Sequence, residues 1–204
     1  EYVNQLINLL KMMIRNTLLA FSALLMSCYL HAQEIVFKDA SAFPLYGQIS
    51  DQTNNRYERL PSSLENVSRE DVWYLGRHSA GLFIRFRSNS TSIHLRWEST
   101  FNNTMNHMTD TGTKGLDLYT IHDGEWRYVC SARPVGKHNE CAVIRNMDPE
   151  YREYMLYLSL YGGVTSLEIG VDEGSVLGQP EVDRPSREKP VVMYGTSILQ
   201  GGCA

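Results

Sequence analysis

The sequence lacks the residue patterns that hold a metal ion. It has four cysteines and six histidines, but no two cysteines are spaced as CxxC and no two histidines as HExxH. Those spacings bring several ligands onto one ion, so their absence argues against a dedicated zinc site. We therefore expect neither a metal nor any other cofactor.

A run of basic residues is also missing. The chain has 19 Lys and Arg against 23 Asp and Glu, which gives a formal net charge of -4. Phosphate backbones and anionic lipids attract clusters of positive charge, so we expect no nucleic acid partner. Because 43% of the residues are hydrophobic and 21% charged, as in ordinary globular proteins, the sequence predicts a folded chain.

The apolar run near the N-terminus is short for a membrane span. Residues 17–30 are mostly apolar, whereas a bilayer core requires ~20 such residues. Lys11 and Arg15 precede the run and small residues follow it, which is the order of a secretory leader. We predict that residues 1–33 are a signal peptide with upstream residues and that the mature protein begins near Gln33 or Glu34. The protein would then be exported to the periplasm or the extracellular space, with a membrane-spanning helix as the competing interpretation.

The few cysteines leave two questions open. Cys28 follows the tripeptide LMS, which resembles a lipobox, so a lipoprotein anchored through Cys28 is the alternative to an ordinary exported protein. Cys130 and Cys141 lie 11 residues apart on neighbouring predicted strands. In an oxidising compartment they could form a disulfide, and two buried thiols explain them equally well.

Short segments typical of β-strands recur between residues 34 and 171. They follow one another at intervals of roughly ten residues, which favours a sandwich or barrel. Most of them alternate between apolar and polar positions and are rich in β-branched or aromatic residues. We therefore predict an all-β domain over residues 34–171, an antiparallel sandwich resembling a jelly roll. Its clearest strands are VWYL, GLFIRFRS, TSIHLRWES, GLDLYTIH, EWRYVCSA, ECAVIRN, YMLYLSLY and TSLEIGVD.

Three junctions between these segments carry residues typical of turns. Asp123 and Gly124 stand between two strands and supply the positive φ of a type I′ hairpin. Residues 88–90, Ser-Asn-Ser, and residues 162–163, Gly-Gly, separate two further pairs of strands. We expect each of these pairs to form a hairpin as well.

The composition changes after the predicted sandwich. Residues 172–189 contain two prolines, two glycines and many charges, which indicates an interdomain linker. The following VVMY is a continuous apolar run, as in a strand buried on both faces of a parallel sheet. We expect residues 190–204 to begin an α/β domain that is truncated in this sequence.

Ser197 lies in YGTSI, just after that apolar run. Ligands and catalytic groups collect at the carboxyl ends of strands in open α/β sheets, so the position suits a nucleophile. A Gly-Thr-Ser sequence after a strand is also a common turn, and the local pattern alone leaves both interpretations open.

Four segments of the chain resemble segments of one known family and follow the same order as they do there. They are WYLGRHSAGLFIRFRSNS, MNHMTDTGTKGLDLY, REYMLYLSLYGGVTSLEIGV and VVMYGTSILQGGCA. Together they resemble SGNH hydrolases of the branch whose N-terminal sandwich carries a GxDLY motif, over roughly residues 34–204. The resemblance implies a flavodoxin-like second domain and makes Ser197 the catalytic nucleophile. The first conserved block of the SGNH domain, which contains the serine, most often reads GDS. In this sequence it reads GTS, with Thr196 in place of the aspartate, and the resemblance associates this form with the GxDLY branch. The family's later blocks, which supply the base and most of the oxyanion donors, are expected beyond Ala204.

The family-like motifs also contain four polar residues of the sandwich. We consider Asn106, His107, Asp117 and Tyr119 as contacts to substrate or to the second domain. Strand alternation places Asp117 on the face opposite the two leucines of GLDLY, so a solvent-facing or loop-bracing carboxylate is the alternative. A further pair, Arg77 and His78, is expected in a solvated turn.

These observations predict the N-terminal portion of an exported serine esterase or acyl hydrolase. Its substrate would be a small ester, for which an acylated saccharide is suggested by similar architectures. Besides the substrate, the expected partner of the sandwich is the missing C-terminal SGNH domain of the same chain. The alternatives are a noncatalytic carbohydrate-binding module and a structural sandwich that forms one wall of the active site.

Overall fold

The computed structural model describes residues 2–29, 34–182 and 191–201. The chain divides into two compact units, residues 1–34 and residues 35–204. The first unit contains one helix, α1 (Tyr2–Tyr29). Within the described ranges, none of the helices combines the length and the apolar character that crossing a bilayer requires.

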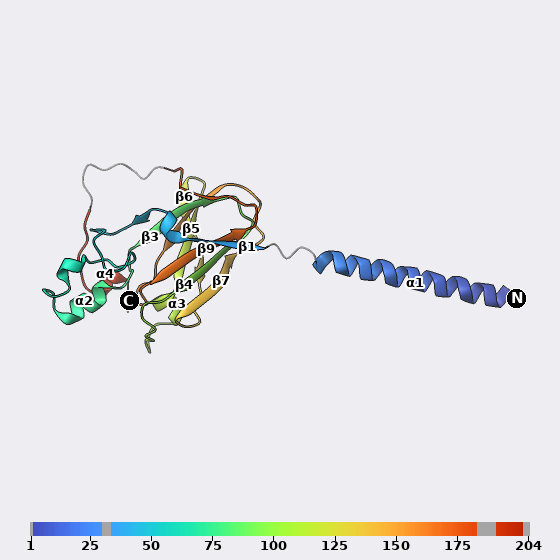
Figure 1. Ribbon diagram of the computed structural model, residues 1–204, viewed down its shortest axis with the longest axis horizontal. Helices are drawn as coiled ribbons and strands as arrows, with labels where there is room; N and C mark the ends of the chain where they lie inside the picture. Colours follow the sequence, from blue (N-terminus) through green and yellow to red (C-terminus); the bar gives the residue numbers. More distant parts are fainter. Residues whose placement is uncertain (1, 30–33, 183–190, 202–204) are drawn as a thin grey trace. The chain divides into compact units, whose positions relative to one another are not determined.

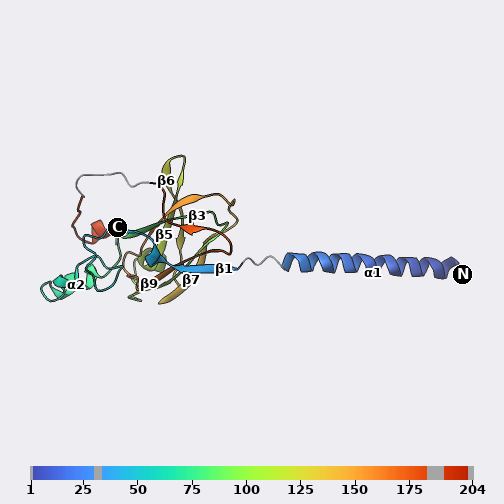
Figure 2. The ribbon, with the colours of Figure 1, turned by 45° about the horizontal axis from the view of Figure 1, so that its top comes forward.

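The second unit is built on two antiparallel sheets (Figures 1 and 2). The smaller sheet, called sheet A, has the strand order β1-β9-β4-β7. Every neighbouring pair in it is antiparallel. Its strands are β1 (Ile35–Asp39), β4 (Ile93–Glu98), β7 (His138–Ile144) and β9 (Ser166–Asp172).

The larger sheet, called sheet B, has the order β10-β3-β8-β5-β6, and the short β2 also pairs with β3. All of its pairings are antiparallel as well. Its strands are β2 (Leu45–Tyr46), β3 (Phe83–Ser88), β5 (Leu116–His122), β6 (Glu125–Ala132), β8 (Arg152–Tyr157) and β10 (Leu177–Gly178). The predicted all-β antiparallel sandwich is confirmed.

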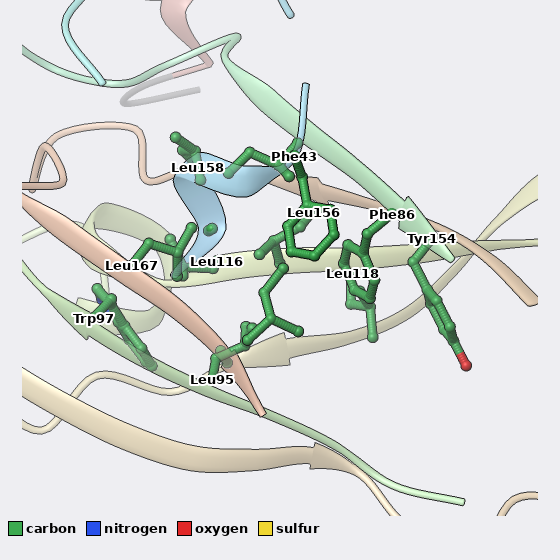
Figure 3. Close-up of a cluster of buried hydrophobic side chains, with 14 of the residues drawn as sticks. Phe43, Phe86, Leu95, Trp97, Leu116, Leu118, Tyr154, Leu156, Leu158 and Leu167 are labelled. Carbon is green, nitrogen blue, oxygen red and sulfur yellow. The ribbon is translucent and has the colours of Figure 1, made fainter. Parts of the chain in front are cut away.

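The core lies between the inner faces of the two sheets (Figure 3). Sheet B contributes fully buried side chains such as Phe86, Leu118 and Leu156, and sheet A contributes Leu95 and others. Because successive side chains of a strand point to opposite faces, every second residue enters this core. The same alternation leaves one outer face on each sheet for other contacts.

The helices of the second unit are short. They are η1 (Ala40–Ala42), η2 (Ser62–Leu64), α2 (Glu70–Gly76), α3 (Asp110–Lys114) and α4 (Ser197–Gln200). The strand predicted for VWYL, residues 72–75, is wrong because these residues form most of α2. Two acidic residues, Glu70 and Asp71, lie in its first turn, where they stabilise a helix.

One of the three predicted hairpins is confirmed and two are wrong. Asp123 and Gly124 have φ angles of 52° and 76° and connect the paired strands β5 and β6. Residues 88–90 instead lead from sheet B to sheet A, since β3 and β4 belong to different sheets. Residues 162–163 likewise lie between β8 of sheet B and β9 of sheet A. Both turns are therefore crossings between layers.

Cys130 and Cys141 are free, partly buried thiols in the structure. Burial raises the pKa of the Cys141 thiol. The sequence left open whether these two cysteines form a disulfide or remain thiols, and in the structure they are thiols.

Candidate functional site

Ser197 is the first residue of α4 and is exposed. The preceding VVMY run forms no strand within the described part of the chain, and Tyr194 is 90% exposed. A strand buried on both faces needs neighbouring strands and covering helices, and the described residues provide none for it. The second domain therefore stays a prediction, as does the role of Ser197.

The turn that begins at Ser197 is attached to the sandwich through Gln200. Its side-chain amide donates to the carbonyl oxygen of Leu160 at 2.8 Å and lies 3.2 Å from Nδ1 of His78. Gly201 ends α4 with a φ of 83°, a conformation that suits glycine. The segment of the predicted nucleophile therefore contacts residues of two different parts of the sandwich chain.

His78 is buried, which corrects the expectation of a solvated turn. Only 2% of its surface is exposed. Three aromatic rings meet its imidazole edge to face, those of Tyr74, Phe101 and Tyr161, at centroid distances of 5.3, 5.4 and 5.6 Å. Burial, with Arg59 and then Arg77 as further causes, lowers the pKa of His78 to about 4. The imidazole is therefore neutral at neutral pH and can accept a hydrogen bond.

Two arginines complete the surroundings of this histidine. Nε of Arg59 donates to the backbone carbonyl of His78 at 2.9 Å. Arg77 forms an ion pair with the buried Glu58 at 2.9 Å, and its guanidinium lies over the ring of Phe101. Sequence patterns did not indicate this cluster, because its members come from distant segments and only their packing reveals it.

Asn106 and His107 lie in an exposed turn before α3. Nδ1 of His107 lies 2.8 Å from Oδ1 of Asn106, so the two side chains interact with one another. Met105 and Met108 close the turn through an isolated β-bridge. The arrangement leaves both polar side chains accessible to a partner.

The GxDLY motif spans the start of β5, from Gly115 to Tyr119. Leu116 and Leu118 are fully buried in the core. A Cβ on Gly115 would lie 2.3 Å from the carbonyl oxygen of Thr111, so this position requires glycine. Asp117 faces outward, as strand alternation predicted, and accepts a hydrogen bond from Ser131 Oγ at 2.5 Å. The carboxylate thus braces β5 against β6.

Tyr119 belongs to a row of aromatic side chains that crosses the outer face of sheet B. Neighbouring rings in the row have centroids 5.0 to 5.6 Å apart. Burial, followed by the charge of Asp117, raises the pKa of Tyr119. We call this set the aromatic row; in order across the sheet it consists of Tyr46, Phe83, Tyr157, Tyr119 and Tyr128. Tyr128, at one end, is 56% exposed.

Two further features fall outside these places. A hollow of about 440 Å³ on sheet A is lined by residues that include Arg96, His138 and Glu168, and by none of the predicted site residues. Among the residues that the structure describes, no cluster of histidine, cysteine or carboxylate side chains is arranged to hold a metal ion.

The predicted site residues therefore occupy three places. Asp117 and Tyr119 share the outer face of β5, Asn106 and His107 share a turn, and Ser197 begins α4. The structure brings the members of each pair together. It adds a fourth place, the buried surroundings of His78, which contact α4 directly through Gln200.

Solved structures with a similar fold include a protein from Bacteroides ovatus and an acyltransferase. A Bacteroides ovatus protein assigned to the GDSL-like lipases is 34% identical, with a TM-score of 0.76 over 82% of this chain and 49% of its own. Salicylyl-acyltransferase SsfX3 from a tetracycline biosynthetic pathway is 18% identical, with a TM-score of 0.51 over 76% of this chain and 44% of its own. The chain thus spans about half the length of these structures. No curated protein matches it.

A family model also matches most of the sandwich. The GxDLY family, described as the N-terminus of SGNH-hydrolase-type esterases, covers residues 35–177, which is more than half of the chain. This range runs from the first residue of β1 to the first residue of β10. It contains both sheets apart from the last residue of β10, and it contains the motif whose aspartate braces β5. The chain therefore belongs to the GxDLY family, the N-terminal domain of SGNH-hydrolase-type esterases.

Proposed function

We propose that this chain is the N-terminal part of an exported serine esterase in which Ser197 is the nucleophile. Membership of the GxDLY family supports the hydrolase class. The observation that carries the proposal is the position of Ser197, an exposed serine at the first residue of a helix that follows an apolar run. A serine exposed at the start of such a turn can present its hydroxyl to a substrate.

The reaction would proceed in two steps. Ser197 Oγ attacks the carbonyl carbon of the ester while a histidine base accepts its proton, and the alcohol leaves with that proton as an acyl-serine forms. Water then attacks the acyl-serine, which releases the acid and restores the hydroxyl. The backbone N–H of Ser197 would be one donor to the oxyanion, and such a donor is worth roughly 10²–10³ in rate. The base and the other donors would come from the SGNH domain of the complete protein.

We further propose an acylated saccharide as the substrate. The aromatic row supports this choice because flat, partly exposed rings offer an apolar surface to the carbon-bound hydrogens of a sugar ring. Asp117 and Ser131 lie beside the row and add polar partners for hydroxyl groups. Asn106 and His107, exposed in their turn, are proposed to contact substrate or the second domain.

The same row favours one other function, a noncatalytic carbohydrate-binding module. Both functions use the row to bind a saccharide, and they differ in whether the complete protein also hydrolyses an ester. A binding module would retain the saccharide, and replacing Tyr128 by alanine would weaken retention in affinity electrophoresis. If the row only packs against protein, the chain and its Tyr128→Ala variant would migrate alike.

The test of the esterase is a comparison of two proteins on an activated acetyl ester. The product of the complete gene should hydrolyse the ester well above a heat-treated control. The 204-residue chain should not exceed that control, because a serine without its base and most of its oxyanion donors is not activated. Absence of hydrolysis by the complete protein, on this ester and on acetylated saccharides, would refute the proposal.

A further inference from the structure

Gln200 lies one helical turn after Ser197, and its side-chain amide points to the sandwich. The amide donates to the Leu160 carbonyl oxygen at 2.8 Å and lies 3.2 Å from His78 Nδ1. In an α-helix, residues three apart lie on the same side. A side chain fixed at residue 200 therefore also limits how the turn that carries Ser197 can move.

The histidine that contacts Gln200 is held by packing and by a hydrogen bond within the sandwich. His78 is 2% exposed and is enclosed by the rings of Tyr74, Phe101 and Tyr161. Arg59 holds the backbone carbonyl of the same histidine at 2.9 Å. Neither the imidazole nor its backbone can turn away without breaking these contacts.

The hydrogen-bonding groups in this site match a side-chain amide. The lowered pKa of His78, caused first by burial and then by Arg59 and Arg77, keeps the imidazole neutral. A neutral imidazole has one nitrogen that accepts and one that donates. With Nδ1 as acceptor and the Leu160 carbonyl as a second acceptor, the two N–H groups of the Gln200 amide each have a partner.

The next residue, Gly201, also lies near this part of the sandwich. A Cβ on Gly201 would be 3.6 Å from Cδ1 of Leu160, so the backbone at the end of α4 passes close to the same part of the sandwich. Gly201 also has a φ of 83°, which ends the helix at this point. The end of the turn therefore lies close to Leu160, beside the contact that the Gln200 side chain makes.

We propose that Gln200 is a positioning residue and that the His78–Leu160 site of the sandwich holds the nucleophile turn in its working orientation. This inference rests on the proposed esterase function. It gives the sandwich a part in catalysis that is separate from substrate binding, because the buried His78 and the Leu160 carbonyl act on the turn through Gln200.

The expected effect is on turnover. A nucleophile displaced by about 1 Å can lose roughly 10²-fold in rate. Replacing Gln200 by leucine in the complete protein keeps the side chain similar in size and removes both hydrogen bonds. It should lower kcat by roughly 10- to 100-fold and leave KM within about threefold.

Gln179 offers a matched control. It is an exposed glutamine whose amide donates to a backbone carbonyl of the sandwich, that of Ala42, at 2.6 Å. Gln179→Leu should leave kcat within about twofold, since this residue is on the linker side of β10. His78→Asn, whose carbonyl oxygen can replace Nδ1 as acceptor, should retain more of the wild-type kcat than His78→Leu.

A second readout does not depend on activity. In the 204-residue chain labelled with ¹⁵N-histidine, the Nδ1 resonance of His78 should shift in Gln200→Leu and stay unchanged in Gln179→Leu. An unchanged resonance in Gln200→Leu would overturn the contact itself.

Comparison with Ser197→Ala separates the two hypotheses. If Ser197→Ala abolishes turnover but Gln200→Leu keeps wild-type kcat, the positioning role is wrong and the esterase stands. If Ser197→Ala keeps wild-type turnover, the proposed function is wrong and the positioning role fails with it.

Discussion

The hydroxyl of Ser92 donates a hydrogen bond of 2.6 Å to the carboxylate of Asp172. This bond connects the end of β9 to the segment just before β4. Ser90 and Thr91 donate to the same carboxylate, whose residue is only 3% exposed. The crossing from sheet B to sheet A is therefore held by one buried acid.

Replacing Asp172 by asparagine should destabilise the sandwich by about 3 kcal/mol, because an amide nitrogen would face buried donors. Urea unfolding measures this change. Asp123→Asn, a substitution at an exposed turn acid, is the control and should shift the free energy of unfolding by less than about 0.5 kcal/mol. An equal effect of the two substitutions would contradict the role of Asp172.

The carboxylate of Asp172 should make the stability of the sandwich depend on pH in the acidic range. Burial raises the pKa of Asp172, but the hydrogen bonds from Ser92, Thr91 and Ser90 outweigh it and lower the pKa below its ordinary value. A lowered pKa in the folded state gives stability that is present above the unfolded pKa of about 3.9 and is lost as the pH falls further. Asp172→Asn should lack this loss.

Gly115→Ala tests the glycine of the GxDLY motif. The new Cβ would lie 2.3 Å from the Thr111 carbonyl oxygen and 3.0 Å from that of Ala132, and both are backbone atoms that cannot move aside cheaply. We expect a loss of roughly 1–3 kcal/mol, measured by thermal unfolding. Gly136→Ala is the control, because nothing lies within 4 Å of its added Cβ. Equal stability of the two variants would show that Gly115 is not constrained.

His78 should make stability depend on pH between about 6.5 and about 4. Burial and the neighbouring arginines lower its pKa from 6.5 to about 4 in the folded chain. Between these values the unfolded chain binds more protons, so the stabilising contribution is complete above pH 6.5 and falls as the pH drops toward 4. The loss should be of the order of 3 kcal/mol, since one pKa unit corresponds to about 1.4 kcal/mol.

Urea unfolding at several pH values measures this loss. His78→Asn should flatten the pH dependence in this window, whatever it does to stability at neutral pH. A variant that keeps the wild-type slope would show that His78 titrates normally in the folded protein.

Export predicts a shortened chain. Residues 11–33 have the order of a secretory leader, with basic residues before an apolar run and small residues after it. Mass spectrometry of protein made from the complete gene in an exporting host should find a new N-terminus near Gln33 or Glu34. A mature chain that still contains Met13 would refute export, and a lipid on Cys28 would favour the lipoprotein alternative.

Strand positions could be predicted because alternation is a local signal. EWRYVCSA matches β6 from Glu125 to Ala132, and Asp123 with Gly124 fixes its hairpin with β5. The strand predicted for VWYL was wrong because four apolar residues fit a helix as well as a strand. The acidic residues before the run stabilise the first turn of the helix.

Which strands pair and which polar side chains are buried could not be predicted from such local signals. Whether residues 88–90 turn back or cross to the other sheet depends on Asp172, which lies 80 or more residues later in the chain. His78 looked like a solvated residue because Tyr74 is the only enclosing ring near it in sequence, while Phe101 and Tyr161 come from other segments. The outward direction of Asp117, by contrast, follows from alternation alone.

Ser197 is proposed to be the nucleophile of an esterase. The most direct test is the kcat of the complete protein and of its Ser197→Ala variant on an activated acetyl ester. Removing a nucleophile from an intact catalytic set lowers turnover by several orders of magnitude, so the variant should fall about 10⁴-fold or more below the wild type. Wild-type turnover by Ser197→Ala would contradict the assignment and the function built on it.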